Sequence, residues 1–366
     1  MTDEVRLERL RPAGLEAALA RAPIAWIPLG AIEFHAQHLP FGTDGFTGHG
    51  LLERAARRAG GVVLPWSYLT IGTLHFPWTF RYDPEVVAAS VLGTLRQAAS
   101  FGARVAVVHT GHAPLDLVHL LKRTCAEAET AIGGGFRAYG LTYLELNAAL
   151  DVGLGTDWPV AVDHGATLET SWMLALEPEL VALDTLPADD GEPIVGVYGP
   201  NPRTRADGDR GRDQVEAAVE LLAGRALDLL GGGPFDTFAD LRGFVERYWP
   251  EPLRLGALAG GPQAGGPTLT NDGPVSRYLT AARLRVDGVE VASDRYSLLN
   301  ATPGEPPRPV PAGSLGPESG FYVRRGQTAT IVLADGLAAG PHAIELTVGL
   351  AGVSEVTLAG DVEAAP

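Results

Sequence analysis

The fold is decided by the apolar run IAWIPL at residues 24–29 and by the loop EFHAQHLPFGTD at residues 33–44 that follows it. The loop packs two carboxylates and two imidazoles into twelve residues, a density of metal-ligand side chains that is rarely structural. A buried strand that ends in a loop of Glu, His and Asp is the usual arrangement of an α/β hydrolytic site, because strand ends hold reactive groups rigidly at the edge of a sheet. We therefore expect a functional site directly after this strand.

Apolar runs and helical patterns alternate through the first two-thirds of the chain. Strands are expected at residues 24–29, 62–69, 105–109 and 136–144, and helices at 45–58, 84–100, 113–131, 168–175 and 213–230. This alternation is the signature of a largely parallel sheet that is flanked by helices. The expected fold class is therefore α/β.

The last third of the chain has a different texture. Residues 255–274 are rich in Gly and Pro and show no helical period, which indicates a linker. Short strands are expected beyond it, at residues 282–291, 320–323, 328–333 and 342–348. Because 366 residues exceed what one core usually organises, we expect a main domain at 1–250, a linker at 251–274 and a small antiparallel β-sandwich at 275–366.

The composition restricts the class of partner. A formal charge of -16 and a pI near 5.0 would repel nucleic-acid backbones and anionic membranes, so a small polar or neutral substrate fits better. The single cysteine, Cys125, is expected to be a core thiol, and no basic and apolar leader opens the chain, so a cytoplasmic location is expected. No apolar stretch is long enough to cross a bilayer.

Three side chains of the first loop form a candidate metal site. A divalent ion that keeps positions open for water or substrate is commonly held by imidazole and carboxylate groups together, and Glu33, His35 and Asp44 offer that mixture. Glu33 and His35 are two residues apart, so in an extended loop they point to the same side. Asp44 could bridge two ions through its two oxygens, or it could cap the helix that follows.

A second segment, VAVVHTGHA at residues 105–113, runs from a buried strand into a Gly-containing turn. In a parallel sheet the end of this strand lies at the same edge as Glu33 and Asp44, so His112 can complete their metal site. His109 still lies within the strand pattern. It is expected to be a hydrogen-bonded core histidine.

A third segment, DHGATLETS at residues 163–171, leads from a loop into an apolar helix. His164 is a candidate proton donor or substrate clamp, because an imidazole titrates near neutral pH. Glu169 lies in the first helical turn, where it could cap the helix and complement the helix dipole. Close to a metal it could instead act as the catalytic base.

Together the three segments resemble the creatininase (creatinine amidohydrolase) family. The family pattern is a Glu-x-His-Gly-x-His-Leu-Pro…Thr-Asp loop, an Asn-Gly-His turn and a His-Ala-Gly-x-x-Glu-Thr-Ser segment, and the resemblance covers about residues 15–230. It implies that Glu33, Asp44 and His112 hold one metal. It also implies that His35 and the bridging Asp44 hold a second, that His164 contacts the substrate, and that the protein is a homo-oligomer, with a hexamer as the form seen in related enzymes.

The chain departs from the family pattern at several positions. Creatininase has a glutamate for its second metal two residues after the turn histidine, and Pro114 stands there instead. The second ion must then take another ligand, either Glu169 or Asp116, or be absent, and creatinine itself is not expected as the substrate. Trp78 replaces a glycine beside His75, where it would narrow a substrate pocket, add a stacking surface or enter the core. The other changes are Ala36 for glycine, Thr110 for asparagine, and Gly165-Ala166 for Ala-Gly.

The expected function is that of a metal-dependent amidohydrolase acting on non-peptide C–N bonds. A water activated by one or two ions of Zn, Mn or Fe(II) would attack the carbonyl of a small amide, cyclic or linear. The metal or His164 would stabilise the oxyanion, and Glu169 would relay the proton. A deformylase or lactone hydrolase would use the same site. The alternative of a different class is a non-catalytic, metal-containing assembly or binding protein, suggested by Pro114 and the appended β-rich region.

Overall fold

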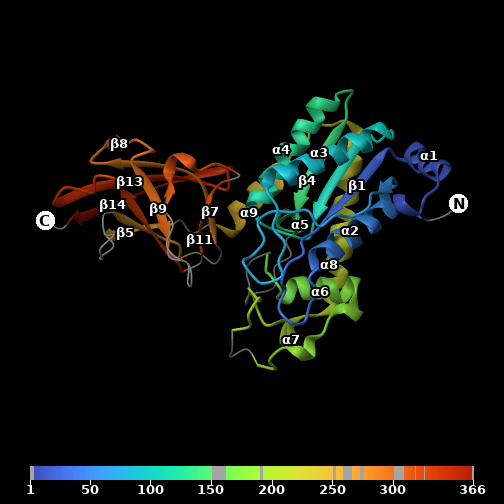
Figure 1. The fold of residues 1–366 in the computed structure, drawn as a ribbon, viewed down its shortest axis with the longest axis horizontal. Coiled ribbons are helices and arrows are strands. Elements are labelled where there is room, and N and C mark those ends of the chain that lie inside the picture. The colour runs from blue at the N-terminus through green and yellow to red at the C-terminus, as the bar shows by residue number, and fades with distance from the viewer. Residues whose placement is uncertain are drawn as a thin grey trace. The chain divides into compact units, whose positions relative to one another are not determined.

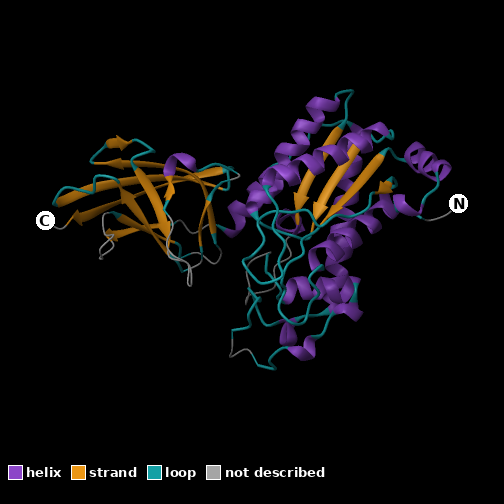
Figure 2. Ribbon diagram, in the orientation of Figure 1, coloured by secondary structure: helices purple, strands orange, loops and turns teal. Residues whose placement is uncertain are grey.

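The structure, a computed structural model, describes residues 4–150, 162–189, 193–249, 253–258, 266–272, 276–300, 309–317, 319–324 and 326–364. The chain divides into two compact units, Met1–Asp240 and Leu241–Pro366. The first unit contains a parallel sheet with its helices, and the second contains antiparallel sheets (Figures 1 and 2).

The first unit is built on a four-stranded parallel sheet with the strand order β2-β1-β3-β4. Its strands are β1 (Ile24–Leu29), β2 (Val62–Val63), β3 (Val105–Thr110) and β4 (Arg137–Thr142). Every residue of β1 and β3 is buried, as expected for parallel strands that are covered on both faces. The prediction of a parallel α/β sheet is confirmed.

One strand is much shorter than the sequence predicts. The run at residues 62–69 pairs with β1 as a ladder only through Val62 and Val63. The regular register would place Trp66 beside Leu29, so one extra residue interrupts the ladder, and the N–H that Pro65 lacks would face away from β1, on the side where Val63 donates to Val5. The chain meets β1 again at one bridge, between Ser67 and Leu29. The residues that follow form a loop at the edge of the sheet where β1 ends.

Helices cover both faces of this sheet (Figure 2). On one face, a core cluster that includes Trp26 is shared by α2 (Thr43–Ala59), α5 (Tyr143–Leu150), α6 (Thr167–Leu176) and α8 (Gly208–Gly231). On the other face, α3 (Pro84–Ser100) and α4 (Leu115–Ile132) pack in a cluster with Ile27. Trp26 and Ile27 enter different clusters because successive side chains of a strand point to opposite faces.

The remaining helical elements of the first unit are shorter. They are η1 (Leu7–Arg9), α1 (Pro12–Arg21), η2 (Pro178–Leu180), η3 (Leu183–Thr185) and α7 (Pro202–Arg205). Cys125 lies in the cluster under α4, where burial raises the pKa of its thiol to about 12, so the expected core thiol is confirmed. Among the described residues, every helix is too short or too polar to cross a membrane.

The second unit contains two antiparallel sheets, with the strand orders β10-β9-β12-β6-β5 and β11-β7-β13-β14, and with β8 paired to β7. A buried hydrogen bond from the Tyr296 hydroxyl to the Ala282 carbonyl joins the two sheets. The antiparallel prediction for this region is confirmed. The elements are α9 (Ala239–Tyr248), which contains the unit boundary, β5 (Arg254–Leu258), β6 (Pro267–Thr270), β7 (Arg277–Val286), β8 (Val289–Val291), β9 (Tyr296–Asn300), β10 (Val310–Pro311), η4 (Ala312–Ser314), β11 (Phe321–Val323), β12 (Thr328–Leu333), β13 (Gly340–Leu350) and β14 (Ser354–Ala364).

The prediction of a linker at residues 251–274 is wrong for the part of this segment that the structure describes. It contains β5 and β6, which pair with each other in antiparallel register, for example Leu255 with Leu269. The alternation of Thr268, Leu269 and Thr270 is a strand pattern, but it is short and lies among Gly and Pro residues that indicate a loop. The second unit therefore begins at Leu241, before the boundary expected at 250.

Candidate metal centre

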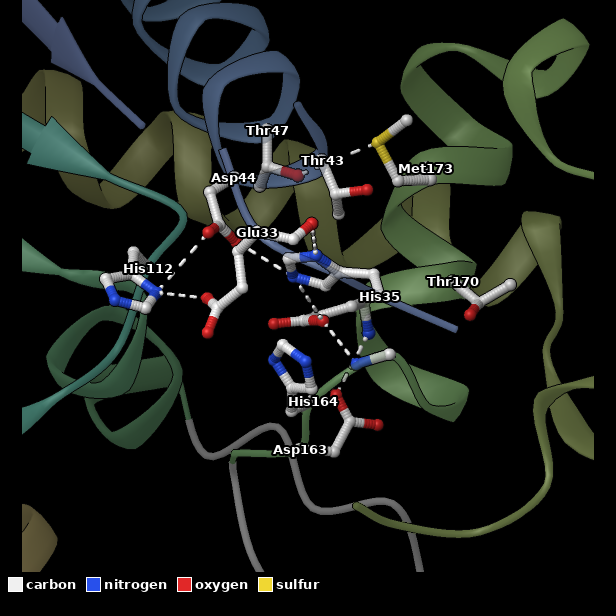
Figure 3. A network of polar contacts seen from close by, with 12 residues as sticks. Glu33, His35, Thr43, Asp44, Thr47, His112, Asp163, His164, Thr170 and Met173 are labelled. Carbon is white, nitrogen blue, oxygen red and sulfur yellow. Dashed lines mark hydrogen bonds and ion pairs between the residues drawn. The ribbon is translucent and has the colours of Figure 1, made fainter. Parts of the chain in front are cut away.

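Polar side chains from four segments meet at the carboxyl edge of the parallel sheet (Figure 3). All of them are buried, and they are Glu33 and His35 after β1, Asp44 at the start of α2, His112 after β3, and Glu169 in the first turn of α6. The turn after β3 approaches α2 closely, since a Cβ on Gly111 would lie 2.6 Å from the Asp44 carbonyl oxygen. Only glycine allows this approach, and it brings His112 beside Asp44.

The first group of ligand-type side chains consists of Glu33, Asp44 and His112. His112 Nδ1 lies 3.1 Å from Glu33 Oε2 and 3.3 Å from Asp44 Oδ2. The other ring nitrogen, Nε2, donates a hydrogen bond to the Ile71 carbonyl at 3.1 Å. In the neutral ring the lone pair is then on Nδ1, the atom that faces both carboxylates, which is how a protein usually orients a metal-binding imidazole.

The second group consists of His35, Asp44 and Glu169. His35 Nε2 lies 3.3 Å from Asp44 Oδ1 and 3.5 Å from Glu169 Oε2. His35 Nδ1 donates to the Glu33 carbonyl at 3.0 Å, so Nε2 carries the lone pair of the neutral ring. Asp44 thus belongs to both groups, and Figure 3 shows it between the two imidazoles, with one oxygen toward each.

Several polar atoms of these groups have no hydrogen-bond partner among the described residues. They are Glu33 Oε2, His35 Nε2 and Asp44 Oδ2, and all three are inaccessible to solvent. Leaving a buried polar atom unpaired costs about 1–3 kcal/mol, more when it is charged, so three such atoms in one place call for a missing partner. The carboxylate and imidazole donors together fit a divalent cation of the Zn or Mn type.

The electrostatics of the site point the same way. Burial raises the pKa of Asp44, but the adjoining His35 and His112 lower it well below its ordinary value. Burial lowers the pKa of His35, yet Asp44 and Glu169 raise it to about 10. Burial, together with the neighbouring carboxylates, raises the pKa of Glu169 well above its ordinary value. Three carboxyl groups, those of Glu33, Asp44 and Glu169, thus share one buried volume, and a cation bound between them would favour their charged forms.

His164 lies beside these groups and forms a third group of ligand-type side chains with Glu33 and His35. Its Nε2 donates to the Phe34 carbonyl at 2.9 Å, and its ring centroid lies 4.3 Å from that of His35. Burial and the charge of His35 lower the pKa of His164 to about 4, so the ring is neutral near pH 7. Its backbone pairs with Tyr198 in both directions, at 3.2 and 2.8 Å, which fixes its position. The neutral ring has its lone pair on Nδ1.

The part of the chain that carries these side chains matches a known protein family. The sequence model of the creatininase family, described as creatinine amidohydrolase, matches residues 8–223 of this chain, a range that includes Glu33, His35, Asp44, His112 and Glu169. The chain belongs to the creatininase family.

Individual creatininases agree with this assignment. The creatinine amidohydrolase of Pseudomonas putida is 28% identical over an alignment of 230 positions, which covers 55% of this chain and 87% of the relative. A solved structure described as "Creatininase Mn" is 25% identical with a TM-score of 0.51, over 61% of this chain and 97% of that one. A creatininase variant described as a Zn-Zn type is also 25% identical, with a TM-score of 0.50 and the same coverage.

Two departures from the creatininase pattern lie at positions with a left-handed backbone. Ala36, which replaces a glycine, has a left-handed backbone with φ of 59°, so the family glycine avoids strain there. Gly165 and Ala166 are exchanged relative to the pattern. Gly165 has φ of 54°, and a Cβ on it would lie 2.5 Å from the Gly196 carbonyl oxygen, so glycine is required at this position in this chain.

The other residues singled out in the sequence lie outside the groups of ligand-type side chains. Pro114 is the residue before the first turn of α4, and among the described residues Asp116 belongs to none of the ligand groups. His75 and Trp78 lie on the loop at residues 71–80, and both are exposed, so the alternative of Trp78 as a core aromatic is wrong. His109 is buried in β3, and its Nδ1 donates to the Leu141 carbonyl at 3.3 Å, as predicted.

Two polar residues that support the site were not predicted. The Asp163 carboxylate accepts from the backbone N–H groups of Leu168 at 2.6 Å and Glu169 at 3.2 Å, so it caps α6. The sequence pattern did not indicate this role, because a capping residue is sought directly before the first turn and Asp163 lies further upstream. His38 is buried with its Nε2 2.9 Å from Thr170 Oγ1. Its place in the first motif was the only signal for it.

Proposed function

We propose that this creatininase is a two-metal hydrolase acting on a small amide. The observation that carries the proposal is the position of Asp44, whose Oδ2 lies 3.3 Å from His112 Nδ1 and whose Oδ1 lies 3.3 Å from His35 Nε2. A carboxylate placed in this way can bridge two ions. Asp44 would then share the first ion with Glu33 and His112. It would share the second with His35 and Glu169.

The donor set and the relatives favour manganese or zinc. Imidazole nitrogen and carboxylate oxygen suit both ions, and the titles of two creatininase structures name Mn and Zn. When bound, such an ion supplies two effects, a lower pKa for a water molecule and polarisation of the substrate carbonyl.

We assign Glu169 to the second ion and not to proton transfer, which revises its expected role. Pro114 offers no carboxylate where the family pattern has glutamate, and Glu169 Oε2 lies 3.5 Å from His35 Nε2. Glu169 Oε2 also accepts the backbone N–H of Gly165 at 2.7 Å, which holds the carboxylate toward the site. Capping and metal binding are therefore compatible roles for one side chain.

We assign proton transfer to His164. The Phe34 carbonyl takes the Nε2–H, so the neutral ring offers the lone pair of Nδ1 as a proton acceptor. The lowered pKa keeps the ring in this form near pH 7. After accepting the proton lost by the attacking water, the ring can pass it to the leaving nitrogen of the amide. The substrate is expected to be an amide other than creatinine, because Pro114 changes the surroundings of the second ion.

The test is a count of bound metal, followed by a turnover assay. We expect inductively coupled plasma mass spectrometry to find two ions per chain in the wild type and one in Glu169→Gln. Asp116→Asn is the matched control, a nearby carboxylate outside the three groups of ligand-type side chains, and it should keep both ions and the wild-type turnover. Turnover is measured on a panel of formamides, lactams and acyclic amides.

The outcomes separate the assignments. One ion in the wild type, or loss of an ion in Asp116→Asn, would contradict the assignment of Glu169 to a second ion. His164→Gln should keep both ions and lose turnover by roughly 10²–10⁴-fold, the usual contribution of a positioned acid or base. Full turnover in that variant would remove His164 from the mechanism.

A further inference from the structure

The loop at residues 71–80 is tied directly to the metal-ligand side chains. The carbonyl of Ile71 accepts from His112 Nε2 at 3.1 Å, and the backbone N–H of Leu74 donates to Glu33 Oε1. Further along, the N–H of Phe80 donates to the Ile32 carbonyl at 2.8 Å. The loop therefore forms part of the wall of the site, and its side chains are held at a fixed place relative to the ligands.

Exposed apolar side chains gather on the loops around the site. The described residues include ten large hydrophobic side chains that are exposed, and five of them lie on the ligand loop, on the loop at 71–80, or on the segment that pairs with His164. These five are Phe41, Trp78, Phe80, Val195 and Tyr198. Such a concentration beside a site indicates a binding surface, whereas single exposed hydrophobics need no explanation.

The aromatic rings form a continuous path from this surface to the ligands. Trp78 lies 6.2 Å from Phe41, which lies 6.5 Å from Phe34, and Phe34 lies 5.2 Å from Phe76. From Phe76 the path continues to Tyr198 at 6.5 Å, then to His164 at 5.9 Å. We call Phe41, Phe76, Trp78 and Tyr198 the aromatic shelf. Trp78 and Tyr198, at the two ends of the shelf, are both exposed, and Tyr198 also lies beside the proposed base.

Trp78 has a strained backbone and little burial to offset the strain. Its backbone has φ of 62°, a left-handed conformation that is strained for a bulky residue and free of strain for glycine. Its side chain is 71% exposed, so burial contributes little in return. Strained residues of this kind persist mainly at ligand clamps and active sites. We therefore expect the indole to contact a bound ligand.

We propose that the aromatic shelf binds a planar apolar group of the substrate, so that the substrate class is amides with an aromatic or similarly flat substituent near the scissile carbonyl. The inference rests on the proposed function. A second copy of the chain is the competing occupant. The substrate is favoured because the shelf is continuous with His164 and because its loop is hydrogen-bonded to Glu33 and His112.

The test uses hydroxamates, which bind metal ions through two oxygens and require no turnover. Acetohydroxamate is compared with phenylacetohydroxamate, 3-phenylpropionohydroxamate and 4-phenylbutyrohydroxamate by titration calorimetry on the metal-loaded full chain. At least one phenyl-bearing probe should bind roughly tenfold more tightly than acetohydroxamate, since ring stacking and burial add to the shared metal contact. Tyr198→Leu should remove this preference for the shortest phenyl probe and Trp78→Ala for the longest.

Two further variants separate recognition from structure. Trp78→Gly relieves the backbone strain, so it should lose the preference while its melting temperature stays at or above that of Trp78→Ala. Phe101→Ala is the control, because Phe101 is an aromatic side chain with 43% exposure that lies before β3, at the opposite edge of the sheet. It should leave all four affinities unchanged.

The contrary outcomes are distinct. Equal affinity for all four probes in the wild type, or a preference unchanged in both Trp78→Ala and Tyr198→Leu, would overturn the shelf. A smaller oligomer in the shelf variants with the preference intact would assign this surface to a second copy of the chain. Failure of acetohydroxamate itself to bind the loaded protein would instead count against the proposed metal centre, and the shelf as a substrate site would be rejected with it.

Discussion

We predict that Lys122→Met destabilises the protein by about 3–5 kcal/mol, because it leaves a buried carboxylate without its counter-charge. Lys122 Nζ lies 2.7 Å from Glu145 Oε1 and donates to the Gly140 carbonyl, also at 2.7 Å. Glu145 Oε2 accepts the backbone N–H of Thr142 at 3.1 Å. Lys122 is 4% exposed and Glu145 is fully buried, so the pair joins α4, β4 and α5 out of contact with water.

The double variant decides whether this loss comes from the uncompensated charge. Burial already raises the pKa of Glu145, and Lys122 acts against that rise. Removing Lys122 alone leaves only protonation of Glu145 as relief, whereas Lys122→Met with Glu145→Gln removes both charges and keeps an acceptor for the Thr142 N–H. A buried pair replaced by neutral groups of similar size often costs little. The double variant should therefore lie within about 2 kcal/mol of the wild type.

Urea unfolding followed by tryptophan fluorescence measures these differences in the first unit. Of the six tryptophans, five precede Leu241, at positions 26, 66, 78, 158 and 172. A loss below about 1 kcal/mol in Lys122→Met would refute the reasoning, since the charge would then be solvated or neutralised in some other way. A double variant as unstable as the single variant would also refute it, because the cost would then arise from packing and not from charge.

Two further predictions concern pH and helix capping. Burial lowers the pKa of His109 to about 4, from 6.5, so between these values the unfolded chain binds a proton that the folded chain does not, and stability falls as the pH falls. His109→Asn should reduce this fall by up to about 1.4 kcal/mol per pH unit, and identical urea midpoints for both proteins across the window would contradict the assignment. Asp163→Ala removes two acceptors at the start of α6, so we expect a loss of about 1 kcal/mol and weaker binding of the second ion through Glu169, with Asp163→Asn intermediate. A metal titration with equal affinities for all three proteins would rule out this positioning role.

The fold could be predicted where the signal is local. The bounds of β1, α3 and β12 agree with the patterns at residues 24–29, 84–100 and 328–333. The predictions failed where pairing depends on distant residues. Regular pairing of β2 ends ahead of Pro65, and β6 forms within Gly- and Pro-rich sequence because it pairs with β5 and with β12. A composition rule for loops takes no account of such partners.

The site divides in the same way. Glu33, Asp44 and His112 could be placed together because two parallel strands end at one edge of a sheet, a rule that needs no side-chain detail. The role of Glu169 could not be fixed, since capping and metal binding use the same first helical turn, and only the 3.5 Å approach to His35 places it beside the second site. The exposure of Trp78 could not be predicted from the sequence either, because an aromatic residue in a loop can turn toward the core or toward solvent.

The loop at residues 71–80 links the proposed metal centre to the proposed substrate surface. Its two hydrogen bonds act on different proposed ligands of the first ion, since Ile71 fixes which nitrogen of His112 is free and Leu74 holds one oxygen of Glu33. Partners of this kind typically contribute 10–100-fold to metal affinity. The same ten residues carry the exposed Trp78 and the half-buried Phe76, so a change at the tip of the loop that shifts the backbone would alter the first ion as well as the shelf. Substitutions at position 78 that retain its left-handed backbone should therefore leave the metal content unchanged. Such variants would change the substrate preference without loss of metal.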